Sequence, residues 1–262
     1  MSIPSVLCLL TASFLFASCV RDVAYEGGGK TEEETADGGS ASAKTEYNTG
    51  LEGLSAICLN EAGDGLLVAE DNGHVYEFGL DGQLRNTFSF PSPNDAHDWE
   101  GITRAGDGTI YLCEERRREV YRLGKNHQEV TLISKGPEVS GSKDNQGYEG
   151  IAAGPGVLYV CNQSDPLRVY SYSLEKDEWT TAFDADWAES LSDIYYDSTD
   201  GTLWITDAKT QALTQLKTDG TILKTYGISF VDKPEGFCRD TAHGTYWLVC
   251  DKKAKLYNAS NL

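Results

Sequence analysis

Short apolar runs alternate with polar turns along most of the chain. The clearest stretch has apolar runs at 101–103, 109–113, 119–123 and 130–133, with the turn Ala105-Gly106-Asp107-Gly108 between the first two. The runs are short and rich in Val, Ile, Leu and Tyr, which is typical of β-strands. An Asp-Gly turn joins neighbouring antiparallel strands. This stretch therefore predicts four short antiparallel strands in succession.

The same order of runs and turns recurs, and an acidic residue opens each copy. The five openings read Leu51-Glu52-Gly53, Trp99-Glu100-Gly101, Tyr148-Glu149-Gly150, Ser192-Asp193-Ile194 and Pro234-Glu235-Gly236. Their acids are 42 to 49 residues apart, a period that indicates a repeat architecture. Four strands in each repeat describe a propeller blade. We therefore predict an all-β propeller of five four-stranded antiparallel blades over residues 50–262, with six blades as the alternative count.

The last copy contains only three strands, the third of them at Lys255-Leu256-Tyr257. A fourth strand is available from the other end of the domain, at Thr45-Glu46-Tyr47. Pairing these two segments would close the ring of blades and remove an exposed sheet edge. We expect the propeller to close in this way.

The first residues have a different composition. Residues 1–18 carry no charged side chain and are strongly apolar, which predicts a signal peptide. Leu15-Phe16-Ala17-Ser18-Cys19 resembles a bacterial lipobox, which would make Cys19 the lipidated residue; an ordinary cleaved signal peptide is the alternative. Residues 19–49 are mainly Gly, Ser, Thr, Glu and Asp and predict a flexible acidic tether. We expect a lipid-anchored protein of the bacterial cell envelope, on the periplasmic or outer-membrane side.

Charge narrows the classes of partner. The formal net charge of −19 excludes a basic surface for nucleic acid. It also disfavours phosphorylated substrates unless a metal ion bridges them. We expect a monomer that contacts the membrane through its anchor and a protein or small molecule at a face of the propeller.

Five cysteines follow Cys19, and none of them has a C-x-x-C spacing. Cys113, Cys161 and Cys250 fall at the same place in three repeats, where the other two repeats have Ala69 and Thr206. A position that alternates between Cys, Ala and Thr indicates a packing site for a small side chain. We predict free, buried thiols, with disulfides as the alternative.

The repeat also predicts where the acids lie. A hairpin returns the end of its second strand to the level at which the first began, so both positions face the same side of the propeller. The predicted inner ring is Glu52, Glu100, Glu149, Asp193 and Glu235. The predicted second polar ring is Glu70, Glu114, Asn162, Asp207 and Asp251. Oxygen ligands alone favour a hard cation, Ca²⁺ above all. The alternative is that each acid caps its own strand or turn.

The repeat motifs resemble those of the SdiA-regulated, YjiK-type β-propellers, whose relatives include a calcium-regulated propeller. The matching motifs are Asp98-Trp99-Glu100-Gly101-Ile102, Tyr148-Glu149-Gly150-Ile151 and Pro234-Glu235-Gly236-Phe237. The resemblance covers about residues 50–262. It implies a cell-envelope protein that associates with calcium and has no settled activity.

Three functions remain open on these grounds. The first is a calcium-binding envelope propeller with a binding or signalling role and no catalytic activity. The second is a calcium-dependent lactonase or esterase on the same face, with His97 as a candidate general base, although an exposed loop position is its ordinary interpretation. No Gly-x-Ser-x-Gly motif supports a serine nucleophile. The third is a protein-interaction scaffold that uses Trp99, Trp179 and Trp187.

Overall fold

The computed structural model describes residues 42–90, 97–139 and 146–262. The predicted signal peptide, Cys19 and most of the tether lie outside these residues. The prediction of five four-stranded antiparallel blades is confirmed. No helix in the described ranges is long and apolar enough to cross a membrane.

Each of blades 1 to 4 is one antiparallel sheet whose strands follow one another along the chain. Blade 1 contains β2 (Leu54–Leu59), β3 (Gly65–Glu70), β4 (His74–Gly79) and β5 (Leu84–Ser89). Blade 2 contains β6 (Trp99–Arg104), β7 (Ile110–Glu114), β8 (Glu119–Leu123) and β9 (Val130–Lys135). Blade 3 contains β10 (Tyr148–Gly154), β11 (Val157–Asn162), β12 (Arg168–Ser173) and β13 (Glu178–Asp184). Blade 4 contains β14 (Asp193–Asp197), β15 (Thr202–Asp207), β16 (Ala212–Leu216) and β17 (Ile222–Gly227).

Blade 5 joins the two ends of the described chain. It contains β18 (Pro234–Asp240), β19 (Thr245–Cys250), β20 (Lys255–Ser260) and, as its outer strand, β1 (Ser42–Asn48). Thr45 pairs with Asn258 and Tyr47 with Leu256, so the predicted closure is confirmed. The Tyr47 ring also stacks on Trp247 of the same blade, with 5.6 Å between centroids.

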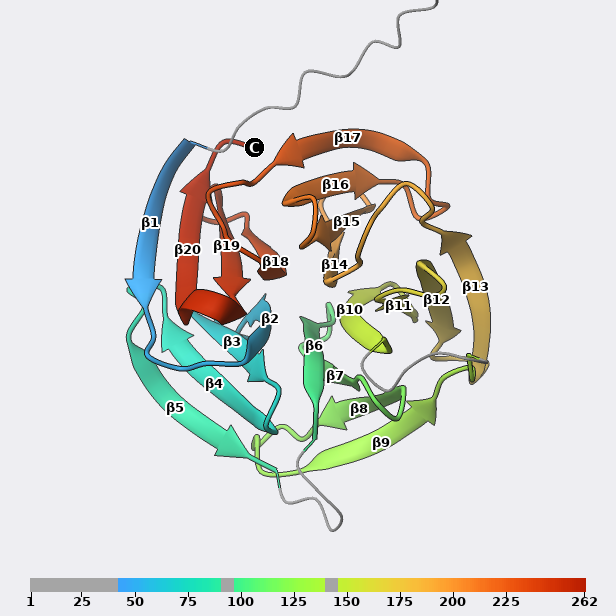
Figure 1. The fold of residues 1–262 in the computed structure, drawn as a ribbon. Helices are drawn as coiled ribbons and strands as arrows, with labels where there is room; N and C mark the ends of the chain where they lie inside the picture. Colours follow the sequence, from blue (N-terminus) through green and yellow to red (C-terminus); the bar gives the residue numbers. More distant parts are fainter. Residues whose placement is uncertain (1–41, 91–96, 140–145) are drawn as a thin grey trace, which may run out of the picture. The chain divides into compact units, whose positions relative to one another are not determined.

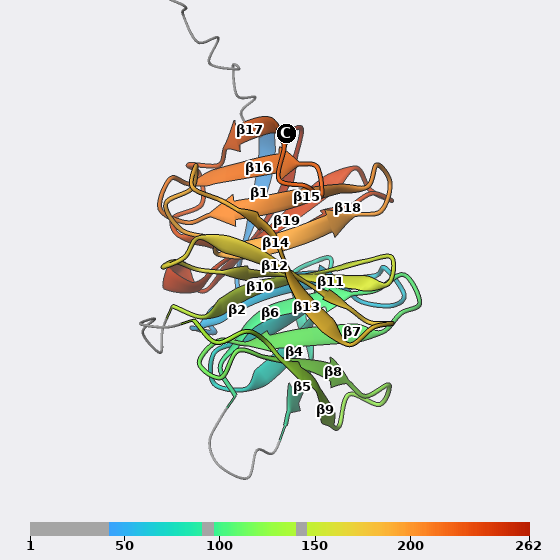
Figure 2. The same ribbon diagram turned by 90° about the vertical axis from the view of Figure 1, so that its right-hand side faces the viewer.

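The first strand of every blade lies nearest the central axis (Figure 1). These inner strands contact one another in the order β2, β6, β10, β14, β18 and back to β2. Figure 2 shows that they run from one side of the propeller to the other. The two ends of the inner strands therefore meet at two opposite mouths of one channel.

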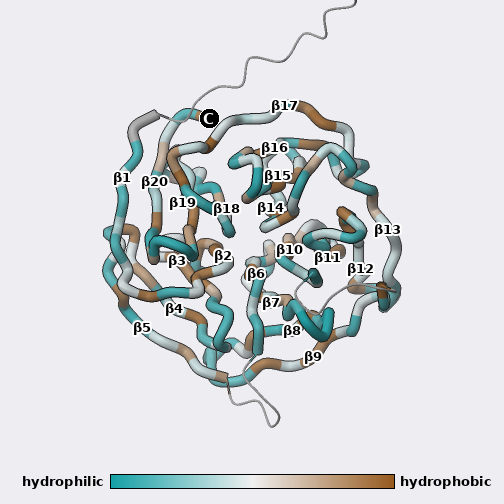
Figure 3. Tube along the Cα trace, in the orientation of Figure 1, coloured by the Kyte–Doolittle hydropathy of each residue, from teal (hydrophilic) through white to brown (hydrophobic). Residues whose placement is uncertain are grey.

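The hydrophobic core fills the spaces between neighbouring blades. Figure 3 shows hydrophobic residues recurring within the strands of every blade and hydrophilic residues in the loops. The largest fully buried side chains include Trp99, Tyr148 and Trp247. Trp99 and Trp179 lie in strands, while Trp187 is 37% exposed. Of the three tryptophans considered for a scaffold surface, only Trp187 is therefore largely accessible.

The five cysteines after Cys19 are free and buried, which confirms the packing interpretation. Cys113 pairs with Gly101 and Cys161 with Gly150, as expected for equivalent positions. Cys250 differs, because it pairs with Pro234 and Val249 takes the position opposite Gly236. Its placement in the shared packing site was wrong by one residue.

Candidate functional site

Three glutamates are directed to one mouth of the channel by β-bulges. Trp99 pairs with Glu114 and Gly101 with Cys113, which leaves Glu100 without a cross-strand partner. Glu149 and Glu235 occupy the same place in their blades, at the start of β10 and β18. A bulge adds one residue to one strand and re-aims its side chain. The repeated acid is therefore a consequence of a repeated backbone irregularity.

The glycine after each glutamate is explained by crowding of the inner strands. A Cβ added at Gly150 would lie 2.6 Å from Asp193 Cα, and one at Gly236 would lie 2.9 Å from Ala56 Cα. At Gly101 it would meet Cys113 Sγ at 2.5 Å. Only glycine leaves room for backbone to approach this closely.

Blade 1 places a serine at the bulge. Ser55 lies between Leu54, which pairs with Glu70, and Ala56, which pairs with Ala69. Glu52 is three residues earlier, before the strand, and is exposed. The structure therefore places Ser55, and not Glu52, in the inner ring. Glu52-Gly53 has the same two residues as the motif, but it lies before β2. It is therefore outside the strand pairing that directs the glutamates of the other blades to the mouth.

Blade 4 has no bulge at this place. Asp193 pairs directly with Thr206 and so takes the position of the glycines in the other blades. It is 2% exposed, and its Oδ2 accepts a hydrogen bond of 2.8 Å from the backbone N–H of Phe237 in blade 5. Burial raises the pKa of Asp193 well above its ordinary range, against the effect of its backbone hydrogen bonds. Asp193 thus ties two inner strands together one residue beyond the mouth.

Four members of the predicted second ring bond within their own blade. Glu114 Oε2 accepts a hydrogen bond of 2.6 Å from Arg117 N, and Glu70 Oε2 lies 2.9 Å from His74 Nδ1. Asn162 Nδ2 donates to two backbone carbonyls, and Asp207 accepts from three backbone N–H groups. For these four residues the structure shows the capping alternative, and they do not line the channel mouth.

Asp251 is the exception in that ring. Its Oδ1 accepts a hydrogen bond of 2.8 Å from Gly53 N, and its Oδ2 lies 3.3 Å from Lys233 Nζ. It lies beyond the end of β19. In blades 1 to 3 the corresponding mouth residues are Asp71, Glu115 and Gln163, each one residue after a predicted one. Side chains of consecutive extended residues point to opposite sides. The sequence therefore contains a signal that distinguishes these mouth residues from the residues of the predicted second ring.

These residues enclose a cavity of about 220 Å³ at the channel mouth, here called the acidic pocket. Its lining residues are Ser55, Asp71, Glu100, Glu115, Glu149, Gln163, Lys233, Glu235 and Asp251. Lys233 is the only cationic side chain among the described residues of this lining, and its Nζ lies 2.6 Å from Glu235 Oε1. Burial disfavours its charge, but Glu235 and Asp251 outweigh that effect and raise the pKa of Lys233.

Crowded carboxyls in the acidic pocket hold protons more strongly than free ones. Burial, followed by repulsion from neighbouring carboxylates, raises the pKa of Glu100 and of Glu149 well above the ordinary range. Burial raises the pKa of Glu115 to about 7 and, with repulsion from Glu70, that of Asp71 to about 6. The repulsion within such a cluster is relieved when the carboxylates bind either protons or a cation.

The tightest group of carboxylates is at blade 2. Oxygen atoms of Asp98, Glu100 and Glu115 all lie within 4.8 Å of one another. Asp98 is buried, and its Oδ2 also accepts a hydrogen bond of 2.6 Å from Arg116 Nε. An oxygen-only donor set of this kind suits Ca²⁺, which accepts irregular coordination by carboxylates.

His97 does not belong to this group. It is 5% exposed, and its ring stacks on Trp99 with 4.2 Å between centroids. Burial, and then the neighbouring Arg117, lowers the pKa of His97. The histidine is thus packed in the core, which differs from the expected exposed loop position. It is not among the residues that line the acidic pocket.

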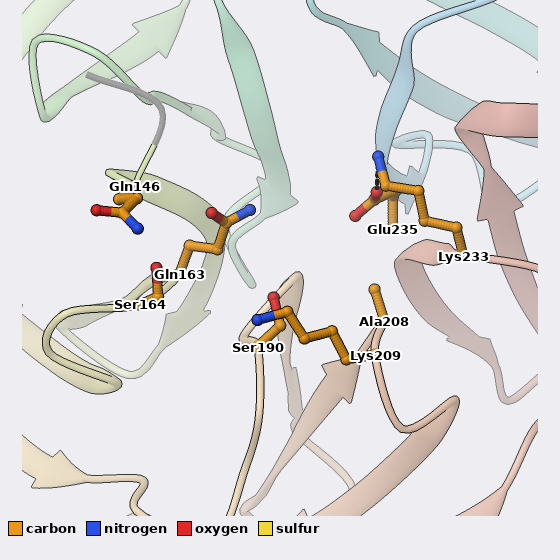
Figure 4. A pocket seen from close by; sticks show the side chains of 8 residues that line it. All are labelled: Gln146, Gln163, Ser164, Ser190, Ala208, Lys209, Lys233 and Glu235. Atoms are coloured by element: carbon orange, nitrogen blue, oxygen red, sulfur yellow. Dashed lines mark ion pairs between the residues drawn. The ribbon is translucent and has the colours of Figure 1, made fainter. Parts of the chain in front are cut away.

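A second cavity of about 330 Å³ adjoins the acidic pocket (Figure 4). We call it the donor pocket; its lining residues are Gln146, Gln163, Ser164, Ser190, Ala208, Lys209, Lys233 and Glu235. Gln163, Lys233 and Glu235 line both cavities. Lys209 Nζ donates a hydrogen bond of 3.1 Å to the carbonyl of Glu189. Carboxylates and hydrogen-bond donors therefore lie side by side on one face.

Solved structures of other proteins share the fold. Myxococcus xanthus glutaminyl cyclase has a TM-score of 0.64 at 8% identity, over 84% of this chain and 95% of that one. A gluconolactonase from Xanthomonas campestris has a TM-score of 0.55 at 11% identity, over 86% and 95%. Staphylococcus aureus virginiamycin B lyase has a TM-score of 0.50 at 19% identity; the match covers 80% of this chain and spans 66% of the lyase. At these identities the likeness concerns the fold alone.

Sequence comparison is more specific. None of the curated proteins matches the chain. A family model described as "Phytase-like: Esterase-like activity of phytase" matches residues 49–188. The matched part contains blades 1 to 3, and with them the Asp98, Glu100 and Glu115 group. Because the match covers more than half of the sequence, the chain belongs to the phytase-like family.

Proposed function

We propose that Asp98, Glu100 and Glu115 bind a hard divalent cation, Ca²⁺ by their donor set, and that this cation serves an esterase-like hydrolytic site. Glu100 and Glu115 line the acidic pocket, and Asp98 adjoins it. The observation that carries the proposal is the approach of Asp98, Glu100 and Glu115 oxygen atoms to within 4.8 Å of one another. The family description supports hydrolysis of an ester. A bound cation of this kind polarises a carbonyl or phosphoryl oxygen and lowers the pKa of bound water.

The residues of the pocket fit a cation by their chemistry. All candidate ligands are carboxylate oxygens, which favour Ca²⁺ or Mg²⁺ over softer metals. Burial, and then repulsion from neighbouring carboxylates such as Asp98, raises the pKa values of Glu100 and Glu115, so cation binding would release protons from the site. We assign Asp98, Glu100 and Glu115 as ligands.

Glu149 is suited to proton transfer. It is 6% exposed, and it lies beside Glu115 in the lining of the acidic pocket. Burial, and repulsion from Glu100 and Glu115, raise the pKa of its carboxyl and so favour the protonated form. A general acid needs a proton that it still holds near neutral pH. We assign Glu149 as the group that protonates the leaving oxygen of the ester.

The donor pocket is suited to hold the rest of the substrate. Lys209, Gln163 and Ser190 present an ammonium, an amide and a hydroxyl group beside the carboxylates (Figure 4). Among the described residues, the Lys209 ammonium has only the backbone carbonyl of Glu189 as a hydrogen-bond partner, so no acid of the described ranges neutralises its charge. This surface favours an ester with a polar or anionic part. Phosphate esters remain compatible, provided that the cation offsets the charge of the acids.

Calcium binding without catalysis is the second candidate. No histidine or cysteine lines the acidic pocket or the donor pocket. Activation of water would then depend on carboxylates alone. Under this alternative the propeller is a lipid-anchored envelope protein, attached through Cys19, that recognises a protein partner when calcium is bound.

Calorimetric titration with Ca²⁺ tests the cation site. The test variant is Glu100→Gln with Glu115→Gln, and the matched control is Glu52→Gln with Glu138→Gln, which removes the same charge from exposed positions. We expect binding to be lost in the test variant and retained in the control. Unchanged binding in both variants would overturn the site.

Turnover of p-nitrophenyl acetate and p-nitrophenyl phosphate tests the reaction. Each is measured after chelation and again after addition of Ca²⁺. Turnover that depends on Ca²⁺ supports the hydrolase. Calcium binding without turnover of either ester favours the binding protein.

A further inference from the structure

The opposite mouth of the same channel forms a separate cavity of about 310 Å³. Each inner strand contributes a residue at or near its far end: Leu59, Arg104, Ala153, Tyr196 and Arg239. In blades 1, 2, 3 and 5 this residue lies four positions after Ser55, Glu100, Glu149 and Glu235. Cys58, Thr103, Tyr195 and Cys238 precede four of them and line the cavity too. The site is thus built from the ends of all five inner strands, and we call it the basic mouth.

Its charge is opposite to that of the acidic pocket. Of the residues that the structure describes, two arginines and no carboxylate line it, in a chain whose net charge is −19. Arg239 is already neutralised by an ion pair with Asp197, whose side chain is buried. Its guanidinium also lies over the ring of Trp204, 5.8 Å from the centroid. Arg239 is therefore held as part of the wall.

Arg104 supplies the remaining positive charge of the basic mouth. It is half-buried, and its guanidinium forms neither an ion pair nor a hydrogen bond with any residue in the described ranges. Tyr195 lies within electrostatic range of it, and burial raises the pKa of that phenol, which keeps the hydroxyl protonated as a donor. The balance of Arg104, Arg239 and Asp197 leaves one positive charge.

The remaining walls combine apolar side chains with the hydroxyl-bearing residues Thr103, Tyr196 and Ser198. Leu59, Ala105 and Ala153 contribute aliphatic surface, and the thiols of Cys58 and Cys238 are neutral. Burial raises the pKa of Cys58 to about 12, against the effect of Arg104. A concave site that combines apolar surface with convergent polar groups is suited to bind a small molecule.

We propose that the basic mouth binds a small organic monocarboxylate. The carboxylate lies against Arg104 and Tyr195, and the apolar body of the ligand lies against the walls near Leu59 and Ala153. One anionic group matches the single uncompensated positive charge. A phosphate dianion would leave an unpaired negative charge in a partly desolvated site, which is unfavourable. The site is independent of the cation site at the other mouth.

Calorimetric titration of the full chain with benzoate tests this proposal. Benzamide is the neutral analogue, and inorganic phosphate is the alternative anion. We expect saturable benzoate binding in the millimolar range or tighter, no binding of benzamide and weaker binding of phosphate. Arg104→Gln should weaken benzoate binding by about tenfold or more, because a charge-assisted hydrogen bond is lost. Arg104→Lys should retain part of the affinity.

The matched control is Arg85→Gln, which removes the same charge from an exposed position in blade 1. It should bind benzoate as the unmodified chain does. If Arg104→Gln fails to fold, Tyr195→Phe removes the hydroxyl donor alone and should weaken binding severalfold. Absence of benzoate binding, equal binding of benzamide, tighter binding of phosphate, or benzoate affinity unchanged in the folded Arg104 or Tyr195 variant would each overturn the proposal.

Discussion

Asp193 of blade 4 accepts a hydrogen bond from the backbone N–H of Phe237 in blade 5, with 2.8 Å between Oδ2 and N. The contact joins residues 44 positions apart and lies on the wall of the channel. The other blades have Gly or Ala where blade 4 has Asp193. Between blades 4 and 5, the hydrogen bond to the Asp193 carboxyl thus takes the place of the close backbone contact that joins other inner strands.

Loss of this carboxyl should destabilise the propeller. Asp193→Ala leaves the Phe237 N–H buried without an acceptor, which costs about 1–3 kcal/mol. Asp193→Asn keeps an acceptor oxygen and should lose less than half of that. Urea unfolding of the three proteins measures the difference. Equal stability of the Ala and Asn variants would contradict the role of the hydrogen bond.

The glycine that follows each mouth glutamate should resist substitution. At Gly150 a Cβ would meet the Asp193 backbone at 2.6 Å, so Gly150→Ala forces an inner strand to move. We expect a loss of about 1–3 kcal/mol in the free energy of unfolding, as for other overpacked sites. Gly106→Ala is the control, because no atom lies within 4 Å of the added Cβ. Thermal unfolding that lowers Tm equally in both variants would refute crowding as the cause.

The sequence predicts the fold more completely than it predicts the candidate site. Strand composition, Asp-Gly turns and the repeat period predict the blades, and Thr45–Tyr47 completes the last sheet as expected. Glu100, Glu149 and Glu235 follow from the same repeat, since the Glu-Gly pair marks the bulge. These features are local, and local patterns are what a single sequence records.

The sequence alone is not sufficient to predict the register in which neighbouring strands pair. Glu52-Gly53 has the motif but lies outside β2, and only the pairing of Leu54 with Glu70 identifies Ser55 as the equivalent residue. Strand ends are uncertain by one or two residues, and an error of one residue moves a side chain to the other side. Glu114 was therefore assigned to the ring in place of Glu115. The basic mouth was missed because the overall acidity of the chain hides two separate arginines.

The stability of the cation-free protein should depend on pH through the acidic pocket. Folding raises the pKa of Glu115 from 4.5 to about 7 and that of Asp71 from 3.8 to about 6. The folded state therefore binds protons that the unfolded chain releases. This contribution is fully present below about pH 4 and is lost as the pH rises to about 7.

Urea unfolding at pH 5 and pH 8, after chelation and with added Ca²⁺, measures this dependence. Without the cation, stability should be lower at pH 8. With Ca²⁺, the difference should shrink or reverse, because ionised carboxylates bind the cation and ligand binding stabilises the folded state. The Glu100→Gln and Glu115→Gln double variant should lose the effect of Ca²⁺. A calcium effect that persists in this variant would assign the cation to another site.

Substitutions of Glu149 and Glu100 should have different effects on catalysis and on cation binding. Glu149→Gln keeps the shape of the side chain but removes the proton that we assign to the leaving oxygen. It should retain Ca²⁺ affinity within a few-fold and lower kcat for an ester by about 10²-fold or more. Glu100→Gln removes a ligand and should reduce both quantities. An ester with a better leaving group needs less protonation, so it should partly rescue Glu149→Gln and not Glu100→Gln. If both variants lose Ca²⁺ affinity to the same extent, Glu149 is a ligand and the assignment of a separate proton donor fails.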